Sequence, residues 1–232
     1  MNVSVSGIER NHVYEIEADT SESWNVYQYQ YMYSFVDKVY ASKINDTDLV
    51  EHVLEQPNYH SPDNYLAGDI REEFILDLDS NYTEKLNLEI SLHLSRIAEK
   101  PIKRVNFKND GDNTGFWVNK QSPTEYNPLH SHTGIFSFVY YAAIPEEIRN
   151  EHELQRGNSA TRGLIQFVST LTNQMLTFNP RVGDILIFES THLHQVYPFY
   201  RDCVRVSVAG NVYGVEFEDG EIVGDISWST MN

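Results

Sequence analysis

The stretch 127–145, NPLHSHTGIFSFVYYAAIP, combines two histidines with a long aromatic and apolar run. His130 and His132 stand at its head, one residue apart, just before residues that are typical of a buried strand. In a strand, residues i and i+2 point to the same face and lie about 7 Å apart along the chain. The two imidazoles are therefore expected to share a face, with a spacing that suits two ligands of one metal ion.

A third ligand has to come from a distant strand, because one strand cannot surround an ion. The segment 183–198, GDILIFESTHLHQVYP, offers His192 and His194 directly after the strand candidate 184–189. Imidazole groups suit Fe(II), Zn(II), Cu(II) or Ni(II) and disfavour Mg or Ca. An isolated His-x-His pair is common on exposed strands without a metal, but two such pairs on β-rich segments favour a metal site.

Short β-rich segments separated by turn signals dominate the chain from Lys103 onward. Glycine, proline, asparagine and aspartate cluster between them, as in NDGDNTG (109–115) and NPRVGD (179–184). Many short strands at this spacing predict a sandwich or a barrel. We therefore expect a mainly β protein with a jelly-roll core over residues 103–232.

Residues 1–102 are expected to form a helical and extended annex that covers this core within one structural domain. The segment 83–100 is long and poor in β-branched residues, which favours a largely buried helix over a strand. Residues 45–56, NDTDLVEHVLEQ, predict a second helix. The segment 35–44, FVDKVYASKI, has helical spacing and is interpreted as a helix that follows an extended stretch.

The composition is that of a soluble globular protein, with 41% hydrophobic residues among 232. No apolar run approaches the roughly 20 residues of a membrane span, and we identify no secretory signal. Cys203 is the only cysteine, which excludes an internal disulfide and a multi-cysteine zinc site and indicates a reducing, cytoplasmic setting. A net charge of −17 argues against nucleic acid and favours a small molecule or a basic or neutral peptide as substrate. No feature of the sequence specifies an oligomeric state.

The segment 201–212, RDCVRVSVAGNV, has two contrasting faces. One face carries valines 204, 206 and 208 and is expected to pack against the annex. The other carries Arg205 and Ser207 among small or polar residues, so it can line a cavity. A guanidinium there offers a bidentate fork for a carboxylate close to the metal. A surface arginine paired with an acidic residue is the alternative interpretation.

The order of these motifs resembles the 2-oxoglutarate/Fe(II)-dependent oxygenases, above all a small bacterial and phage group. The resemblance covers roughly residues 115–212 and consists of WVN (117–119), the histidine pair, VYY (139–141), P-x-x-GD-x-x-x-F-x-S (180–190), H-x-V (194–196) and R-x-S (205–207). It implies a double-stranded β-helix, another name for the jelly roll, and an enzyme that uses Fe(II) and 2-oxoglutarate to hydroxylate a substrate.

The resemblance also implies roles for single residues. His130 and His194 would be iron ligands, while Arg205, assisted by Ser207, would bind the distal carboxylate of 2-oxoglutarate. Asn119 is the best match for a polar contact to the cosubstrate. One departure concerns His132, because the family usually has Asp or Glu at this position. His132 either completes a three-histidine site or leaves the third ligand position open.

Three further residues are candidates for contacting the metal ligands or the substrate: His192, Tyr126 and Tyr140. Two other functions stay open beside the oxygenase. One is a cupin-like metal-binding jelly roll that works as a dioxygenase or isomerase without 2-oxoglutarate. The other is a jelly-roll binding module without catalysis.

Overall fold

The computed structural model describes residues 13–14, 25–26, 39–44, 50–51, 53–54, 67–75, 81–107, 115–154, 161–170 and 173–224. Within these ranges the chain is mainly β, and every strand pair except β1–β10 is antiparallel. This agrees with the mainly β class that the turn-separated segments predict. Among the described residues, no helix is long and apolar enough to cross a membrane.

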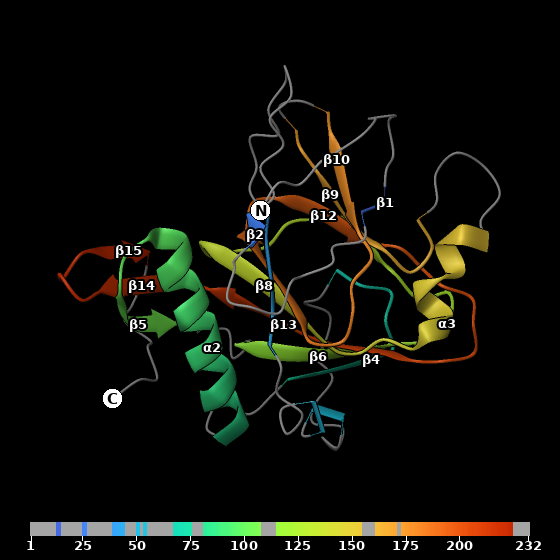
Figure 1. Cartoon of the computed structure of the whole chain (residues 1–232), viewed down its shortest axis with the longest axis horizontal. Helices are drawn as coiled ribbons and strands as arrows, with labels where there is room; N and C mark the ends of the chain where they lie inside the picture. The colour runs from blue at the N-terminus through green and yellow to red at the C-terminus, as the bar shows by residue number, and fades with distance from the viewer. Residues whose placement is uncertain are drawn as a thin grey trace.

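Two sheets build the body of the molecule (Figure 1). The larger has the strand order β2 (Asn25–Val26), β3 (Val39–Lys43), β11 (Asp184–Glu189), β8 (Phe136–Ala143), β13 (Arg205–Val212), β6 (Phe116–Gln121) and β4 (Glu72–Ile75). The smaller has the order β1 (Val13–Tyr14), β10 (Met175–Phe178), β9 (Ile165–Val168), β12 (Leu193–Val196) and β7 (Asn127–His130). A three-stranded sheet of β15 (Ile222–Gly224), β14 (Gly214–Phe217) and β5 (Ile102–Asn106) lies beside them.

The two large sheets pack face to face through a shared apolar cluster. Tyr141 and Phe188 from the larger sheet meet Phe167 and Phe178 from the smaller one in this cluster. Burying one large apolar side chain stabilises a fold by about 1.5–3 kcal/mol, so this layer contributes substantially. Two antiparallel sheets joined in this way are consistent with a jelly roll.

Helix α2 (Asn81–Ala98) covers the other face of the larger sheet and lies next to β5 (Figure 1). Leu86, Ile90 and Leu94 follow each other at intervals of four residues and are buried in a second cluster with Val206 and Val208. The valine face of β13 therefore shares its core with this helix, although Val204 precedes the strand and is 43% exposed.

The expectation of a largely buried helix over 83–100 holds for only one face of α2. Leu88 and Leu92 are 57% and 45% exposed, because only the face with the four-residue spacing meets the sheet. Two shorter helical segments, α3 (Glu146–Arg149) and the 3-10 turn Glu151–Leu154, follow β8.

Residues before 102 also contribute strands to the sheets. The predicted helix over 35–44 is wrong at residues 39–43, which form β3 and pair antiparallel with β11. The edge of β11 offers backbone N–H and C=O groups as hydrogen-bond partners, and a helix over residues 39–43 would leave these groups unpaired. In the predicted helix 45–56, Val50, Glu51, Val53 and Leu54 are helical, and the remaining positions lie outside the described residues.

Candidate active site

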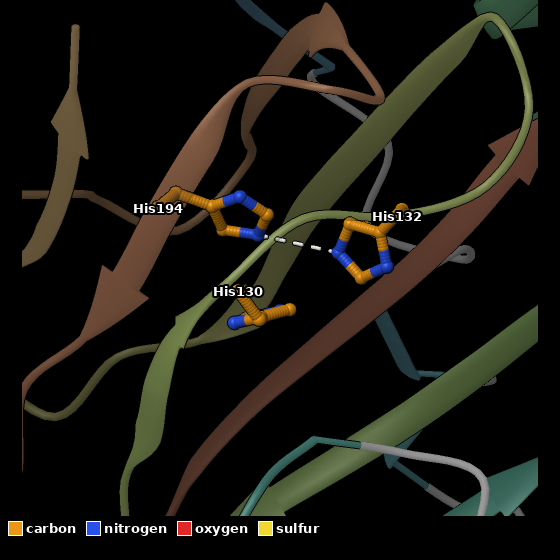
Figure 2. A group of neighbouring side chains, drawn as sticks. All are labelled: His130, His132 and His194. Atoms are coloured by element: carbon orange, nitrogen blue, oxygen red, sulfur yellow. Dashed lines mark hydrogen bonds between the residues drawn. The ribbon is translucent and has the colours of Figure 1, made fainter. Parts of the chain in front are cut away.

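Three histidines from two neighbouring segments converge at one end of the sheets. His130 is the last residue of β7, and its Cα partner across the sheet is His194 on β12. His132 follows in a loop, whose position is fixed because the His132 amide donates to the Ser190 carbonyl at 2.8 Å. Figure 2 shows the three rings grouped together, and one nitrogen from each lies within 4.8 Å of the others. Such a group could hold a metal ion.

The geometry of the histidine pair differs from a simple strand. Because β7 ends at His130, His132 lies beyond the strand and is not two steps along it. The centroids of the His130 and His132 rings are 4.8 Å apart. The expectation that both histidines lie on one strand is therefore wrong, although their rings still lie next to each other.

Backbone carbonyls orient two of the imidazoles. The Nδ1 of His130 donates to the Pro128 carbonyl at 2.6 Å, and the Nδ1 of His194 donates to the His192 carbonyl at 3.0 Å. Each bond leaves Nε2 as the nitrogen with a lone pair, which is the usual way in which a protein prepares a histidine ligand. The Nε2 of His132 lies 3.2 Å from the Nε2 of His194 (Figure 2), so these two nitrogens point to a common centre.

Burial keeps the three rings neutral. Desolvation, with a smaller contribution from His130, lowers the pKa of His132 to about 3. Burial, followed by the neighbouring histidines, lowers the pKa of His194 to about 2, and burial also lowers the pKa of His130. Neutral imidazoles with free lone pairs are the form that binds a divalent cation.

A pocket extends from the histidines along the inner face of the larger sheet. Its wall includes one row of directly paired residues on four adjacent strands: Glu73 on β4, Asn119 on β6, Ser207 on β13 and Tyr141 on β8. The next row contains Arg205, whose Cα partner on β6 is Gln121. Strand alternation thus places Arg205, Ser207 and Asn119 in the same pocket as the three histidines.

Arg205 is a buried cation held by neutral groups. It is 2% exposed, and its guanidinium donates to the Gly163 carbonyl at 2.5 Å and to the Oε1 of Gln121. No carboxylate among the described residues forms an ion pair with it. The interpretation of Arg205 as a surface arginine paired with an acidic residue is therefore wrong. Two of its five N–H donors are used in these bonds, which leaves donors for an anion in the pocket.

The remaining candidates from the sequence occupy different environments. Asn119 is buried and lines the pocket, and its Oδ1 has no hydrogen-bond partner in the part of the chain that the structure describes. Tyr126 is 40% exposed, forms an isolated bridge with Asp69, and does not line the pocket. Tyr140 is fully buried in the cluster beneath α2, while its neighbour Tyr141 faces the pocket. His192 is buried against the ring of Phe167 and contributes its carbonyl, not its side chain, to the histidine group.

Three pocket residues belong to no motif that sequence reasoning recognised: Glu73, Gln121 and Asn127. Trp117 and Gln121 share the alternation of Asn119 on β6, so their orientation could have been predicted from that strand. Glu73 could not, since its place depends on the pairing of β4 with β6.

Comparison with known proteins identifies one matching family. Residues 115–211 match the model of a family described as "Putative 2OG-Fe(II) oxygenase", where 2OG is 2-oxoglutarate. Over these residues the chain is similar to the 2OG-Fe(II) oxygenases. The matched range includes the three histidines, Asn119, Arg205 and Ser207. Fe(II) and 2-oxoglutarate are the cofactors of this oxygenase family, and the histidine group supplies ligands of a suitable type.

Several solved structures resemble the chain at low sequence identity. HygX from Streptomyces hygroscopicus, solved with nickel and 2-oxoglutarate bound, aligns at 10% identity and a TM-score of 0.50 over 74% of this chain and 81% of its own. A Pseudomonas putida prolyl-4-hydroxylase aligns at 12% identity and 0.49 over 76% and 92%. A Trichoplax adhaerens prolyl hydroxylase aligns at 16% and 0.45 over 74% and 82%. The likeness to HygX supports the fold alone. A comparison with curated proteins gave no match.

Proposed function

We propose that the protein is an Fe(II)- and 2-oxoglutarate-dependent oxygenase that hydroxylates a small-molecule or peptide substrate on a double-stranded β-helix. His130, His132 and His194 are the metal ligands, so His132 takes the place of the carboxylate that the family usually has. Arg205 and Ser207 bind the distal carboxylate of 2-oxoglutarate, and Asn119 contacts the cosubstrate. When bound, the iron and 2-oxoglutarate supply the oxidising chemistry.

The observation that carries this proposal is the buried charge of Arg205. Burying a guanidinium without a carboxylate partner is costly, and its remaining donors line the pocket that the histidines share. A ligand carboxylate would neutralise this charge and accept the free N–H groups in bidentate geometry. Three neutral imidazoles leave the charge of a divalent ion uncompensated, which further favours an anionic chelator.

The chain's own residues determine how a ligand would be held. The carbonyls of Pro128 and His192 keep the Nε2 atoms of His130 and His194 directed at the metal position. Gln121 and Gly163 fix the orientation of the Arg205 guanidinium before any ligand arrives. Apolar side chains of the wall, including Phe188 and Ile165, limit the access of water. Such preorganisation lowers the entropic cost of binding.

A calorimetric titration of 2-oxoglutarate tests the proposal. Ni(II) replaces Fe(II) as a redox-inert probe, and the metal-free protein is titrated in parallel. We expect binding to the Ni(II) form and a loss of about tenfold or more in Arg205→Lys, since a point charge replaces the fork. Ser207→Ala should weaken binding less, and both variants should keep their affinity for Ni(II). Fe(II)-loaded wild-type protein with oxygen should convert 2-oxoglutarate to succinate.

Three outcomes contradict the proposal in different ways. Tight Ni(II) binding without any 2-oxoglutarate binding would favour a cupin-like metal protein. Absence of both would favour a binding module without catalysis. Equal 2-oxoglutarate affinity in wild type and Arg205→Lys would remove Arg205 from its role.

A further inference from the structure

Glu73 is a pocket carboxylate that the oxygenase chemistry does not use. It lies on β4, is 7% exposed, and lines the same pocket as the three histidines. No hydrogen bond or ion pair joins it to any other residue that the structure describes. Glu125 is different, because it is also buried but accepts from the amides of Arg71 and Ser122. A buried carboxylate without donors is costly, and a ligand that donates hydrogen bonds would offset the cost.

Two amide oxygens accompany Glu73 in the pocket. The Oδ1 atoms of Asn119 and Asn127 are buried and have no hydrogen-bond partner among the described residues. Asn119 is the Cα partner of Glu73 across the sheet. A Cβ added at Gly68 would lie 2.1 Å from the Oδ1 of Asn127 and 3.3 Å from the Oε1 of Glu73. Only a glycine at this position lets the segment before β4 approach both groups closely, so the subsite is enclosed.

Charge separates this subsite from the proposed 2-oxoglutarate position. Glu73, Asn119 and Ser207 are consecutive partners on three adjacent strands, so Glu73 and Ser207 are about 10 Å apart. Arg205 is the only basic side chain, other than the histidines, among the described residues that line the pocket. One end of the pocket is thus prepared for an anion and the other for a cation.

We propose that Glu73, with the amide oxygens of Asn119 and Asn127, binds a cationic amine or guanidine group of the substrate. This inference rests on the proposed function for the reaction at the metal, but the subsite is centred on Glu73, to which the proposed function gives no role. An anionic group would be repelled by Glu73, and a purely apolar group would leave three acceptors unsatisfied. The substrate class is therefore a basic small molecule or a peptide with a basic side chain.

The test compares four matched probes on Ni(II)- and 2-oxoglutarate-loaded protein by calorimetry. Nα-acetyl-lysine amide and Nα-acetyl-arginine amide carry a cation, Nα-acetyl-norleucine amide is neutral, and Nα-acetyl-glutamate amide is anionic. We expect at least one cationic probe to bind about tenfold or more tightly than the neutral and anionic probes. The same probes are titrated into metal-free protein, which retains the Glu73 subsite.

Glu73→Gln is the deciding variant, because it keeps the shape of the side chain and removes its charge. The cationic probe should bind about tenfold or more weakly to this variant, while 2-oxoglutarate affinity stays within about twofold. Glu72→Gln is the matched control, since Glu72 precedes it on β4, is exposed, and does not line the pocket. This control should bind the probe as the wild type does.

The inference is overturned if neither cationic probe binds, if the neutral or anionic probe binds best, or if Glu73→Gln keeps full affinity. Its failure is distinguishable from failure of the proposed function. If the wild type binds no 2-oxoglutarate but binds a cationic probe that Glu73→Gln binds more weakly, the oxygenase is contradicted and the subsite is supported. If the wild type binds 2-oxoglutarate but no cationic probe, the subsite is contradicted and the oxygenase is supported.

Discussion

Arg205 and Gln121 face each other across β13 and β6, and the Arg205 guanidinium donates to the Oε1 of Gln121. The amide is neutral, so it orients the guanidinium without cancelling its charge. A glutamate in the same place would form an ion pair with Arg205 and neutralise its positive charge. The choice of an amide at this position therefore keeps Arg205 available to an anionic ligand.

A first prediction concerns Gln121. Gln121→Glu should weaken 2-oxoglutarate binding to the Ni(II) form by about tenfold or more, because the new carboxylate competes for Arg205. Gln121→Ala should weaken it less, since it removes orientation but not charge. Calorimetric titration of both variants measures the effect, and a Gln121→Glu protein with unchanged affinity would contradict the assigned role of Arg205.

A second prediction concerns His132. His132→Ala should reduce Ni(II) affinity by about 10- to 100-fold, because it removes one proposed ligand. His132→Asp should keep more affinity, since it restores the ligand type that the family usually has. Competition with a metal chelator measures these affinities. If His132→Ala bound Ni(II) as tightly as wild type, the third ligand position would be open and not filled by His132.

A third prediction uses the pH dependence of folding. Burial, together with Glu125, raises the pKa of Glu73 to about 7 from an ordinary value of 4.5. Between these values the folded chain keeps a proton that the unfolded chain has released, so the contribution of Glu73 to stability falls as pH rises. Above pH 7 the charged Glu73 lowers the free energy of unfolding by its full amount, about 2 kcal/mol. This value allows for the part of the effect that solvent screens.

Glu73→Gln should remove this penalty. Its free energy of unfolding should equal that of wild type near pH 4.5 and exceed it by about 2 kcal/mol at pH 8. Urea denaturation of metal-free protein across this range gives the difference, in which the titration of the histidines cancels. A difference that does not change with pH would show that Glu73 has an ordinary pKa. Glu72→Gln serves again as the exposed control.

A fourth prediction concerns the face of α2 that meets the sheet. Ile90 is fully buried, so Ile90→Ala should destabilise the protein by about 2–5 kcal/mol. Leu88 is 57% exposed on the same helix, and Leu88→Ala should cost about 1 kcal/mol or less. Equal losses in a denaturation experiment would contradict the packing of α2 against the larger sheet.

The sequence predicts the parts of the site that depend on local pattern. Strand alternation places Arg205 and Ser207 on one face, and the structure brings that face into the pocket with the histidines. Residues 83–100 have the length and composition of a helix, and α2 covers most of them. These features follow from periods of two and of about four residues, which are visible without coordinates.

The parts that could not be predicted depend on pairing between distant segments. Residues 39–43 have helical spacing but become a strand, because the edge of β11 is available to them. Glu73 reaches the pocket only because β4 pairs with β6. The short strand Glu72–Ile75 has no alternation of polar and apolar residues from which a strand could be predicted. Tyr140 and Tyr141 are chemically alike, and only the register of β8 decides which of them faces the pocket.

In the proposed function, one pocket holds a metal on three histidines and the distal carboxylate of 2-oxoglutarate on Arg205. A crystal structure of the protein grown with Ni(II) and 2-oxoglutarate would show both contacts. We expect one Ni(II) about 2.1 Å from a ring nitrogen of each of His130, His132 and His194, with a ligand carboxylate in bidentate contact with Arg205. A metal bound elsewhere, or a ligand that leaves Arg205 without a carboxylate, would contradict it.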